Sequence, residues 1–457
     1  MSHLALIILA LIALVIGLSS CSLYHHPYPD NYAPQSAYRI HTVQIDDFGT
    51  FWDASKSQAA IDDVESQSQS MSSSTYVVVF IHGWHHNAAP DDPNLQQFDR
   101  WLAQLSNEFS KPSRSEARRQ LTGSGHFQLI GIYVGWRGRS LPGFLDYGTM
   151  WWRKAAAERV GDGDLGEFLE RLERIYLRAN AFNRYAKNPG STPFTGLFTV
   201  GHSFGGQALL KAVARPIEED LAKRAPSVTS AAAPAVTPAN RTPVTTPIDS
   251  FGDLNVLVNP ATEAYQFARI DDLYRQLSYP TRQTPQLVVF SADNDVPRKS
   301  YFPIARGLTS PFRPKFRNSY QGNLWGKALG ELPEQQSHEL RAAAGEPDSL
   351  NDEDFTPDKL QKVAQYDFTS PTVFSGVRLS RLPSVTPIEN SPVEVIYTHD
   401  KIIDGHNGVF DTGFLDFLSK YIAYMEGKRV VLRYERLQEQ KARVDAGGPA
   451  PSNDAAL

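Results

Sequence analysis

The stretch TVGHSFGGQA, residues 199–208, encloses one serine between glycines. An apolar, β-rich run precedes the serine at residues 197–200, and the helix-forming run QALLKAVA follows it. Gly201, Ser203 and Gly205 fit the pattern G-x-S-x-G, in which the serine occupies a strained turn between a strand and a helix. Flanking side chains would clash in such a turn, which explains the glycines. The pattern predicts that the Ser203 hydroxyl is presented at the end of a buried strand; a purely structural tight turn is the alternative.

Similar apolar runs recur along the chain and alternate with segments of helical periodicity. The runs are continuously apolar, which is typical of strands covered on both faces. Residues 94–109, 164–179 and 414–422 place apolar side chains on one helical face, and Asn94 is positioned to cap the first of these helices. Strands that alternate with helices predict a three-layer α/β/α fold with a mainly parallel central sheet. The predicted strands are residues 38–45, 76–81, 129–134, 197–200, 254–258, 287–290 and 393–397.

Three stretches depart from this alternation. Residues 224–247 are rich in Ala, Pro and Thr and predict a surface loop. Residues 300–392 carry no clear strand pattern, so we expect an irregular insertion or lid there. Residues 431–457 are charged and then rich in small residues, which predicts a disordered tail. The remainder predicts one α/β domain over residues 38–430 with two insertions.

The N-terminal segment differs from the rest of the chain. Residues 4–18 form a continuous apolar run, shorter than the roughly 20 residues that a bilayer-spanning helix needs. The run ends in LSSC, in which Cys21 is the only cysteine of the chain. This ending resembles the lipobox of bacterial lipoprotein signal peptides. The resemblance implies a signal peptide over residues 1–20, a lipid anchor on Cys21 and a tether over residues 21–37.

The flanks of this segment bear on its destination. Ser22, rather than the Asp that favours inner-membrane retention, follows the cysteine, so we expect an outer-membrane lipoprotein that faces the periplasm. The opening MSH supplies no basic residue, unlike most signal peptides. An uncleaved signal anchor in the inner membrane and an ordinary secretory signal remain the alternatives. A formal net charge of −5 gives no reason to expect a nucleic-acid partner.

A serine hydroxyl is a poor nucleophile near neutral pH, so Ser203 needs a base and a group that orients the base. In a fold of this kind the chain order is serine, acid, histidine. His406 follows the last predicted strand inside a Gly/Asn turn, and we predict that it is the base. His399 lies nearer the strand end without flanking glycines and is the alternative.

The acid is expected directly after residues 287–290, where FSADNDVPRKS supplies two aspartates. The spacing from the strand end favours Asp295, and Asp293 is the alternative. Aspartate also commonly caps turns, which is the structural role open to both. A tetrahedral intermediate further needs two donors for its oxyanion. Since FIHGWHHN follows the first long strand, we assign the backbone N–H groups of Trp84 and Phe204 to that task.

The same FIHGWHHN segment contains three histidines and lies close to two aspartates. The spacing does not match that of a zinc enzyme such as H-E-x-x-H, so we expect no metal there. The residues concerned are His82, His85, His86, Asp91 and Asp92. Four tryptophans are candidates to line an acyl pocket, with core packing as their alternative role. They are Trp84, Trp136, Trp151 and Trp152.

Six ordered blocks together resemble the α/β-hydrolase fold serine esterases, and most closely an uncharacterised microbial group of them. The blocks are VVVFIHGWHHNAAPDDPNLQQF, IGIYVGWRG, VGHSFGG, LVNPATEA, DVPRKSYFP and IIDGHNGVF, within residues 76–422. The resemblance implies the α/β-hydrolase fold, a triad of Ser203, Asp295 and His406, and neither metal nor cofactor. It implies hydrolysis of a small-molecule ester through an acyl-enzyme. An acyltransferase or thioesterase with the same triad, and a non-catalytic lipoprotein scaffold, remain alternatives.

Overall fold

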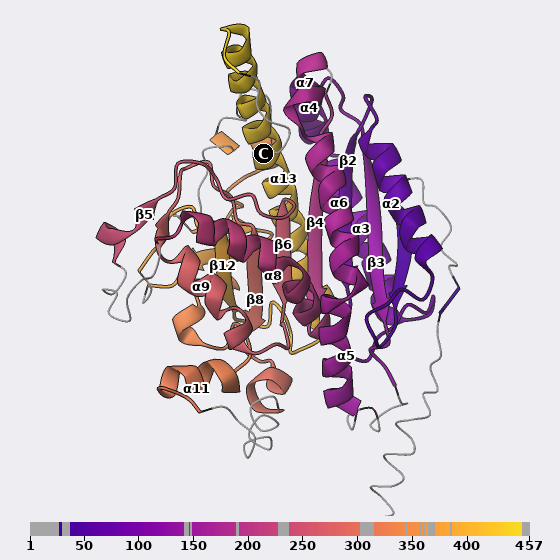
Figure 1. Cartoon of the computed structure of the whole chain (residues 1–457), viewed down its shortest axis with the longest axis vertical. Coiled ribbons are helices and arrows are strands. Elements are labelled where there is room, and N and C mark those ends of the chain that lie inside the picture. Colours follow the sequence, from indigo (N-terminus) through magenta and orange to yellow (C-terminus); the bar gives the residue numbers. More distant parts are fainter. Residues whose placement is uncertain are drawn as a thin grey trace, which may run out of the picture.

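The computed structural model describes residues 27–29, 37–140, 146, 149–188, 192–226, 237–301, 315–343, 345–355, 359, 362–363, 371–383 and 386–449. Cys21, the predicted signal peptide and most of the predicted tether lie outside these residues. The described part of the chain is a mixed α/β fold around a ten-stranded sheet (Figure 1).

Most of the sheet is parallel. The strand order is β1-β3-β2-β4-β6-β8-β12-β9-β11-β10, and the strands from β1 through β9 in this order run parallel to their neighbours. β11 and β10 are antiparallel and form one edge. Two further strands, β5 (Thr242–Pro243) and β7 (Leu277–Ser278), pair separately. The ten strands are β1 (Arg39–Ile45), β2 (Ser74–Ile81), β3 (Phe127–Trp136), β4 (Thr195–His202), β6 (Leu254–Val258), β8 (Leu287–Ala292), β9 (His338–Ala342), β10 (Thr372–Phe374), β11 (Val377–Arg381) and β12 (Val393–Thr398).

Helices cover both faces of this sheet, as Figure 1 shows. The α-helices are α2 (Ala54–Ser68), α3 (Pro93–Phe109), α4 (Pro112–Thr122), α5 (Met150–Asp162), α6 (Asp164–Ala179), α7 (Phe182–Lys187), α8 (Phe204–Arg224), α9 (Ala268–Tyr274), α11 (Ser319–Gly326) and α13 (Thr412–Asp445). Short 3-10 turns are η2 (Pro238–Asn240), η3 (Ala264–Gln266), η6 (Pro333–Gln335), η7 (Asp352–Phe355) and η9 (Gly408–Phe410), and η4 (Pro297–Tyr301) is a π turn.

The side-chain alternation of the central strands explains the two helical layers. On β2, Val77, Val79 and Ile81 belong to one core, which also takes apolar residues from α2, α5, α6, α8 and α9. Tyr76, Val78 and Phe80 belong to the core on the opposite face, with α3 and α13. Every residue of β2 is buried. The continuously apolar strands of the sequence are therefore the strands covered on both faces, and all seven predicted strands are confirmed.

The prediction of an irregular insertion at residues 300–392 is wrong where the structure describes that stretch. β9, β10 and β11 lie within it and extend the central sheet. The sequences of β9 and β11, HELRA and VRLSR, alternate between buried apolar residues, such as Leu340, Val377 and Leu379, and more exposed charged residues. Strands with one wet face do not produce a continuous apolar run.

The predicted disordered tail is also wrong in its first half, because α13 continues to Asp445. Val430 and Leu437 are buried against α7, and Val431 packs against α4. Arg433 forms an ion pair with Asp253, which anchors this part of the helix to the sheet. Apolar residues interspersed with charges in this stretch therefore mark a docked helix.

Two smaller outcomes concern a cap and a loop. Asp92, not Asn94, caps α3: its carboxylate accepts from the Asn94 N–H at 2.9 Å, and Pro93 takes the first helical position. The predicted loop over residues 224–247 begins where α8 ends and contains η2 and β5, while residues 227–236 lie outside the described part.

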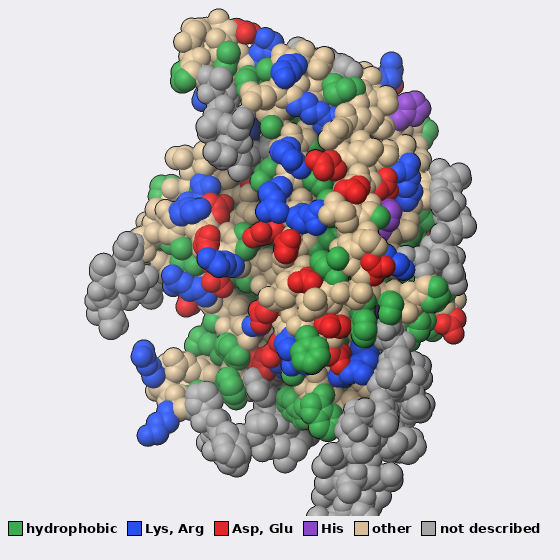
Figure 2. All heavy atoms as spheres, turned by 45° about the vertical axis from the view of Figure 1, so that its right-hand side comes forward, with side chains coloured by type: hydrophobic (Ala, Val, Ile, Leu, Met, Phe, Trp, Pro, Cys, Tyr) green, Lys and Arg blue, Asp and Glu red, His purple; other side chains and the backbone are tan. Residues whose placement is uncertain are grey.

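On the face drawn in Figure 2 charged side chains are spread over much of the surface, and hydrophobic side chains gather at the lower end, near α5. None of the helices in the described ranges is long and apolar enough to cross a membrane.

Candidate active site

Ser203 occupies the turn between the end of β4 and the start of α8. Its backbone has φ +56° and ψ −120°, a conformation that non-glycine residues rarely adopt and that marks local strain. Two backbone hydrogen bonds hold it there: the Ser203 N–H donates to Val258 O, and the Ala261 N–H donates to Ser203 O, both at 3.0 Å. The predicted strand–turn–helix around this serine is thus present.

The glycines around Ser203 are required by close backbone approaches. A Cβ on Gly205 would lie 2.1 Å from Ile81 O, and one on Gly201 would lie 2.7 Å from Gly205 O. A Cβ on Gly83 would lie 2.8 Å from Ser203 Cβ. The ends of β2 and β4 therefore approach each other more closely than any side chain would allow.

A continuous set of hydrogen bonds leads from this serine to a buried carboxylate. Ser203 Oγ lies 2.6 Å from His406 Nε2, and His406 Nδ1 lies 2.7 Å from Asp295 Oδ2. The three residues follow β4, β12 and β8, whose carboxyl ends meet at one edge of the sheet. Asp295 is fully buried, while the His406 side chain is 15% exposed. The structure thus brings together the three residues predicted from the sequence.

The two alternatives form a separate pair. His399 Nδ1 lies 3.3 Å from Asp293 Oδ2, and its Nε2 lies 3.2 Å from Arg341 Nη2. Asp295 is thus the aspartate that contacts His406, and Asp293 contacts the histidine that we considered less suitable as the base.

Arg298 is a buried cation beside the candidate acid, and sequence reasoning missed it. Its backbone N–H donates to Asp295 Oδ1 at 3.0 Å, and its Nη1 lies 3.6 Å from Asp295 Oδ2. Burial alone would raise the pKa of the Asp295 carboxyl, but the contacts with His406 and Arg298 hold that pKa below its usual range. Asp295 is therefore ionised at neutral pH.

Asn259 links three of the loops that form the site. It follows β6 and has φ +45°. Its Nδ2 donates to Gly405 O at 3.0 Å and to His406 O at 3.1 Å. Its Oδ1 accepts from Arg298 Nη1 at 3.1 Å and from the Ala292 N–H at 2.8 Å. A polar residue directly after a buried apolar strand, within LVNPATEA, is the sequence signal for it.

His202, which precedes the serine, also holds the loop of His406. Its Nε2 donates to His406 O at 2.8 Å. Burial, together with the neighbouring His406, lowers the pKa of His202 to about 3. The ring is therefore neutral over the physiological range and acts as a fixed hydrogen-bond donor.

The two residues proposed as oxyanion donors lie close to the serine. Phe204 is the first residue of α8, where backbone N–H groups have no partner within the helix. Trp84 follows Gly83, whose backbone packs against Ser203 Cβ, and the Trp84 and Phe204 rings lie 6.2 Å apart. The start of a helix also favours developing negative charge.

The three histidines of FIHGWHHN each take different partners. His82 is buried, bonds Gly83 O through Nδ1 and accepts from the Trp136 N–H through Nε2. His85 pairs with Asp146 at 2.7 Å and His86 with Asp92 at 3.1 Å. Within the described residues, no group of three or more His, Cys, Asp and Glu side chains has the arrangement of a metal site.

The four tryptophans separate into two groups. Trp136 is buried and its ring stacks on His82, while Trp84 packs partly buried beside Phe204. Trp151 and Trp152, at the start of α5, are 38% and 49% exposed. The last two therefore do not belong to the packed core.

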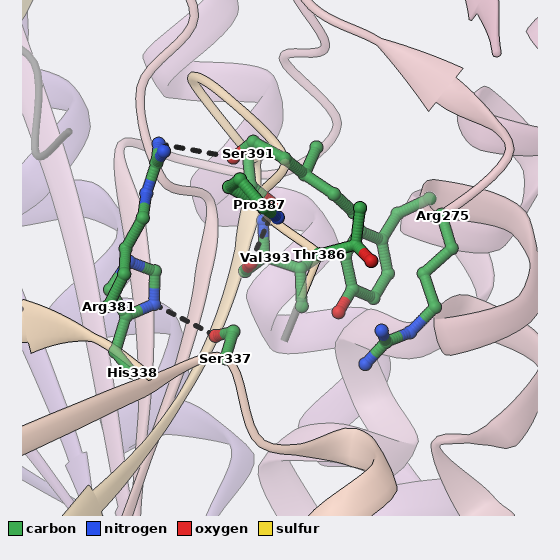
Figure 3. Close-up of a pocket in the computed structure, with 10 residues that line it drawn as sticks. Arg275, Ser337, His338, Arg381, Thr386, Pro387, Ser391 and Val393 are labelled. Carbon is green, nitrogen blue, oxygen red and sulfur yellow. Dashed lines mark hydrogen bonds between the residues drawn. The ribbon is translucent and has the colours of Figure 1, made fainter. Parts of the chain in front are cut away.

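A pocket lies at the opposite edge of the sheet from Ser203. Figure 3 shows Ser337, His338 and Arg381 among its lining residues, at the amino ends of β9 and β12. The His338 Nδ1 is hydrogen-bonded to Ser337 Oγ at 2.9 Å. Because Ser203 follows the carboxyl end of β4, this pocket is separate from the candidate active site.

Comparisons of the chain with protein-family models, with curated proteins and with solved structures give no match. The function is therefore inferred from the residues and geometry of the site.

Proposed function

We propose that this protein is a serine hydrolase of carboxylic esters with the α/β-hydrolase fold. The observation that carries the proposal is the connected set Ser203 Oγ, His406 and Asp295, joined at 2.6 Å and 2.7 Å. A nucleophile, a base and a group that orients the base are the three parts that acyl transfer by serine requires.

The topology gives independent support. The strands β3-β2-β4-β6-β8-β12 lie side by side and parallel, the serine follows β4, the acid follows β8 and the histidine follows β12. In α/β-hydrolases the serine occupies a strained strand-to-helix turn, and acid and histidine follow it in that order along the chain. The positive φ of Ser203 and the glycines on both sides of it agree with this arrangement.

The chemistry follows from the positions of the protons. Asp295 accepts a hydrogen bond from the His406 Nδ1–H, which leaves Nε2 free to take the Ser203 proton. Ser203 Oγ then attacks the ester carbonyl carbon, and the carbonyl electrons move to the oxygen, which accepts from the Trp84 and Phe204 N–H groups. His406 returns the proton to the leaving alkoxide as the C–O bond breaks, which gives an alcohol and an acyl-serine.

The second half repeats these steps with water. His406 Nε2 takes a proton from water, the hydroxide oxygen attacks the acyl carbon, and the proton returns to Ser203 Oγ as the acid leaves. In an acyltransferase a second alcohol takes the place of water in this half, and in a thioesterase a thioester takes the place of the ester in the first half and releases a thiol. Ester hydrolysis is the form of this chemistry that we propose.

The test is fluorophosphonate labelling with the adduct mapped by mass spectrometry. We expect phosphonylation of Ser203, and no labelling of Ser203→Ala although the variant keeps its circular dichroism spectrum. The same variant should lose turnover of short p-nitrophenyl esters. Unchanged turnover in Ser203→Ala rejects the serine as nucleophile, and absence of labelling in the folded wild type favours the scaffold alternative.

We also propose that the chain is attached to a bacterial membrane, on the outer-membrane side of the periplasm, through a lipid on Cys21. The support is the apolar run that ends in LSSC. Cells grown with radioactive palmitate should label the wild type and not Cys21→Ala. Equal labelling of the two chains removes this proposal and leaves an inner-membrane signal anchor or a secreted protein.

A further inference from the structure

Large hydrophobic side chains that are exposed gather at one edge of the molecule. Six of the seven in the described residues follow the carboxyl ends of parallel strands, and the seventh, Met71, precedes β2. The six are Phe48, Trp52, Trp151, Trp152, Tyr265 and Val296. This is the edge at which Ser203 and His406 lie. Single exposed apolar residues need no explanation, whereas a gathering of aromatic rings at one edge does.

Four of these rings form what we call the aromatic rim: Phe48, Trp52, Trp151 and Trp152. They are 81%, 43%, 38% and 49% exposed, in that order. Figure 2 shows hydrophobic side chains at this lower end of the molecule, beside α5.

The rim is carried on a rigid support. Asp47, next to Phe48, accepts from Arg153 Nη1, next to Trp152, at 2.7 Å and also pairs with Arg137. Arg159 donates to Asp47 O at 2.6 Å, which ties the loop after β1 to the body of α5. These partly buried contacts connect the loop that carries Phe48 to the helix that carries Trp151 and Trp152.

The described part of the N-terminal segment arrives at the same edge. The Tyr28 N–H donates to Gln44 Oε1, and Gln44 Nε2 donates to Tyr28 O, both at 2.8 Å. Gln44 is the penultimate residue of β1, at its carboxyl end. Tyr28 lies seven Cα–Cα steps after Cys21, and a chain of that length spans at most about 25 Å. A lipid on Cys21 would therefore keep this edge within that distance of a bilayer.

We propose that the aromatic rim docks into the interfacial layer of a phospholipid bilayer and turns the carboxyl edge of the sheet, with Ser203, toward the membrane. Tryptophan rings prefer the headgroup region, where an apolar body and an N–H group are both accommodated. The net charge of −5 opposes attraction to anionic lipid, so insertion of the rings, and not ion pairing with lipid headgroups, keeps the carboxyl edge of the sheet at the bilayer surface. Given the proposed function, esters embedded in the bilayer are then the substrates nearest the nucleophile.

The test uses the full acylated chain in phosphatidylcholine vesicles. Acylation blocks Cys21, so a cysteine introduced by Trp152→Cys is the free thiol and takes an environment-sensitive fluorophore. The matched control is Ser72→Cys, an exposed position before the amino end of β2. A nitroxide lipid should quench the probe at position 152 at least about twofold more than the probe at position 72. Equal quenching at both positions overturns the proposal.

Two further experiments distinguish insertion of the rings from ionic attraction as the interaction that binds the rim to the bilayer. Phe48→Ser combined with Trp52→Ser should reduce quenching at position 152 to the level of the control; unchanged quenching refutes a role for the rings. Raising NaCl to roughly 0.5 M, where ionic attraction is strongly screened, should change nothing, and a loss of quenching would show ionic docking instead.

Failure of the anchor and failure of the docking give different results. The wild-type chain takes up no fluorophore when Cys21 is acylated. Uptake of fluorophore by the wild-type chain would show that Cys21 is a free thiol and that the anchor is absent. Quenching at positions 152 and 72 is then compared in a Cys21→Ser background, where only the aromatic rim can bring the probe to the lipid. None of these readouts depends on ester hydrolysis, so they hold whatever becomes of the proposed function.

Discussion

Replacing Asp295 by Asn is expected to lower kcat for ester hydrolysis about 10⁴-fold, or roughly 5 kcal/mol in the barrier. The Asp295 carboxylate accepts a hydrogen bond from the His406 Nδ1–H, with Nδ1 2.7 Å from Oδ2, which favours the tautomer whose Nε2 is unprotonated toward Ser203. An amide at the same place donates its own N–H to Nδ1. The imidazole then carries its proton on Nε2, where it faces Ser203 Oγ at 2.6 Å and accepts nothing.

The fold should survive this change, because the size of the side chain is kept and Arg298 retains other partners. Arg298 Nη2 donates to Ser291 Oγ at 2.9 Å and to Leu329 O at 2.6 Å, and lies 3.2 Å from Glu331 Oε1. A charged side chain left with three partners does not become an unpaired buried ion. We therefore expect the loss to appear in turnover and not in the content of folded protein.

The assay is hydrolysis of p-nitrophenyl acetate, with circular dichroism and thermal unfolding measured on the same samples. The matched control is Asp293→Asn, which should stay within about threefold of the wild type because Asp293 contacts His399 and not His406. The reasoning is refuted if Asp295→Asn keeps a tenth or more of wild-type kcat, or if the severe loss occurs in Asp293→Asn alone.

Three further changes test neighbouring features. Gly83→Ala puts a Cβ 2.8 Å from Ser203 Cβ and should lower kcat about 10²-fold with little change in KM, measured by steady-state kinetics. His202→Phe removes the donor to His406 O and should lower kcat about tenfold; because the pKa of His202 is about 3, the shape of the pH–rate profile above pH 5 should not change. Burial raises the pKa of Glu394 from 4.5 to about 7, so the wild type should lose on the order of 2–3 kcal/mol of unfolding free energy as pH rises through that range, and Glu394→Gln should not, measured by urea denaturation at pH 4.5 and 8.

The sequence predicted the parallel part of the sheet because both faces of those strands are covered. A strand such as β2, which is buried at every position, is a continuous apolar run and can be recognised from its own sequence without knowing which strands lie beside it. β9 and β11 lie near one edge of the sheet, and each carries charged residues on its more exposed face, so neither shows a continuous apolar run in the sequence. The end of α13 was missed for a similar reason: its buried residues face α4 and α7, which the local pattern does not contain.

The candidate site divides in the same way. Ser203 and His406 stand out because each needs a particular local backbone, with glycines that the sequence displays. Spacing favoured Asp295 but left Asp293 as an alternative, since the choice depends on which carboxylate contacts which histidine. Asn259 is marked only by its position directly after a buried apolar strand, and Arg298 has no local sequence signature, because both residues act through contacts with segments distant along the chain.

The contacts of Arg298 also explain how a buried cation can lie beside Asp295 and still leave the Asp295 carboxylate able to stabilise a positive charge on His406. Taken as formal charges, Arg298 is positive and both Asp295 and Glu331, its partners at 3.6 Å and 3.2 Å, are negative. The cluster then carries one net negative charge next to His406. In the proposed mechanism His406 gains a positive charge when it takes the Ser203 proton, and that charge would neutralise the cluster at a place where the compensating charge is already fixed. Under this proposal Glu331 offsets the charge of Arg298, so that Arg298 can orient Asp295 while the Asp295 carboxylate still stabilises the imidazolium.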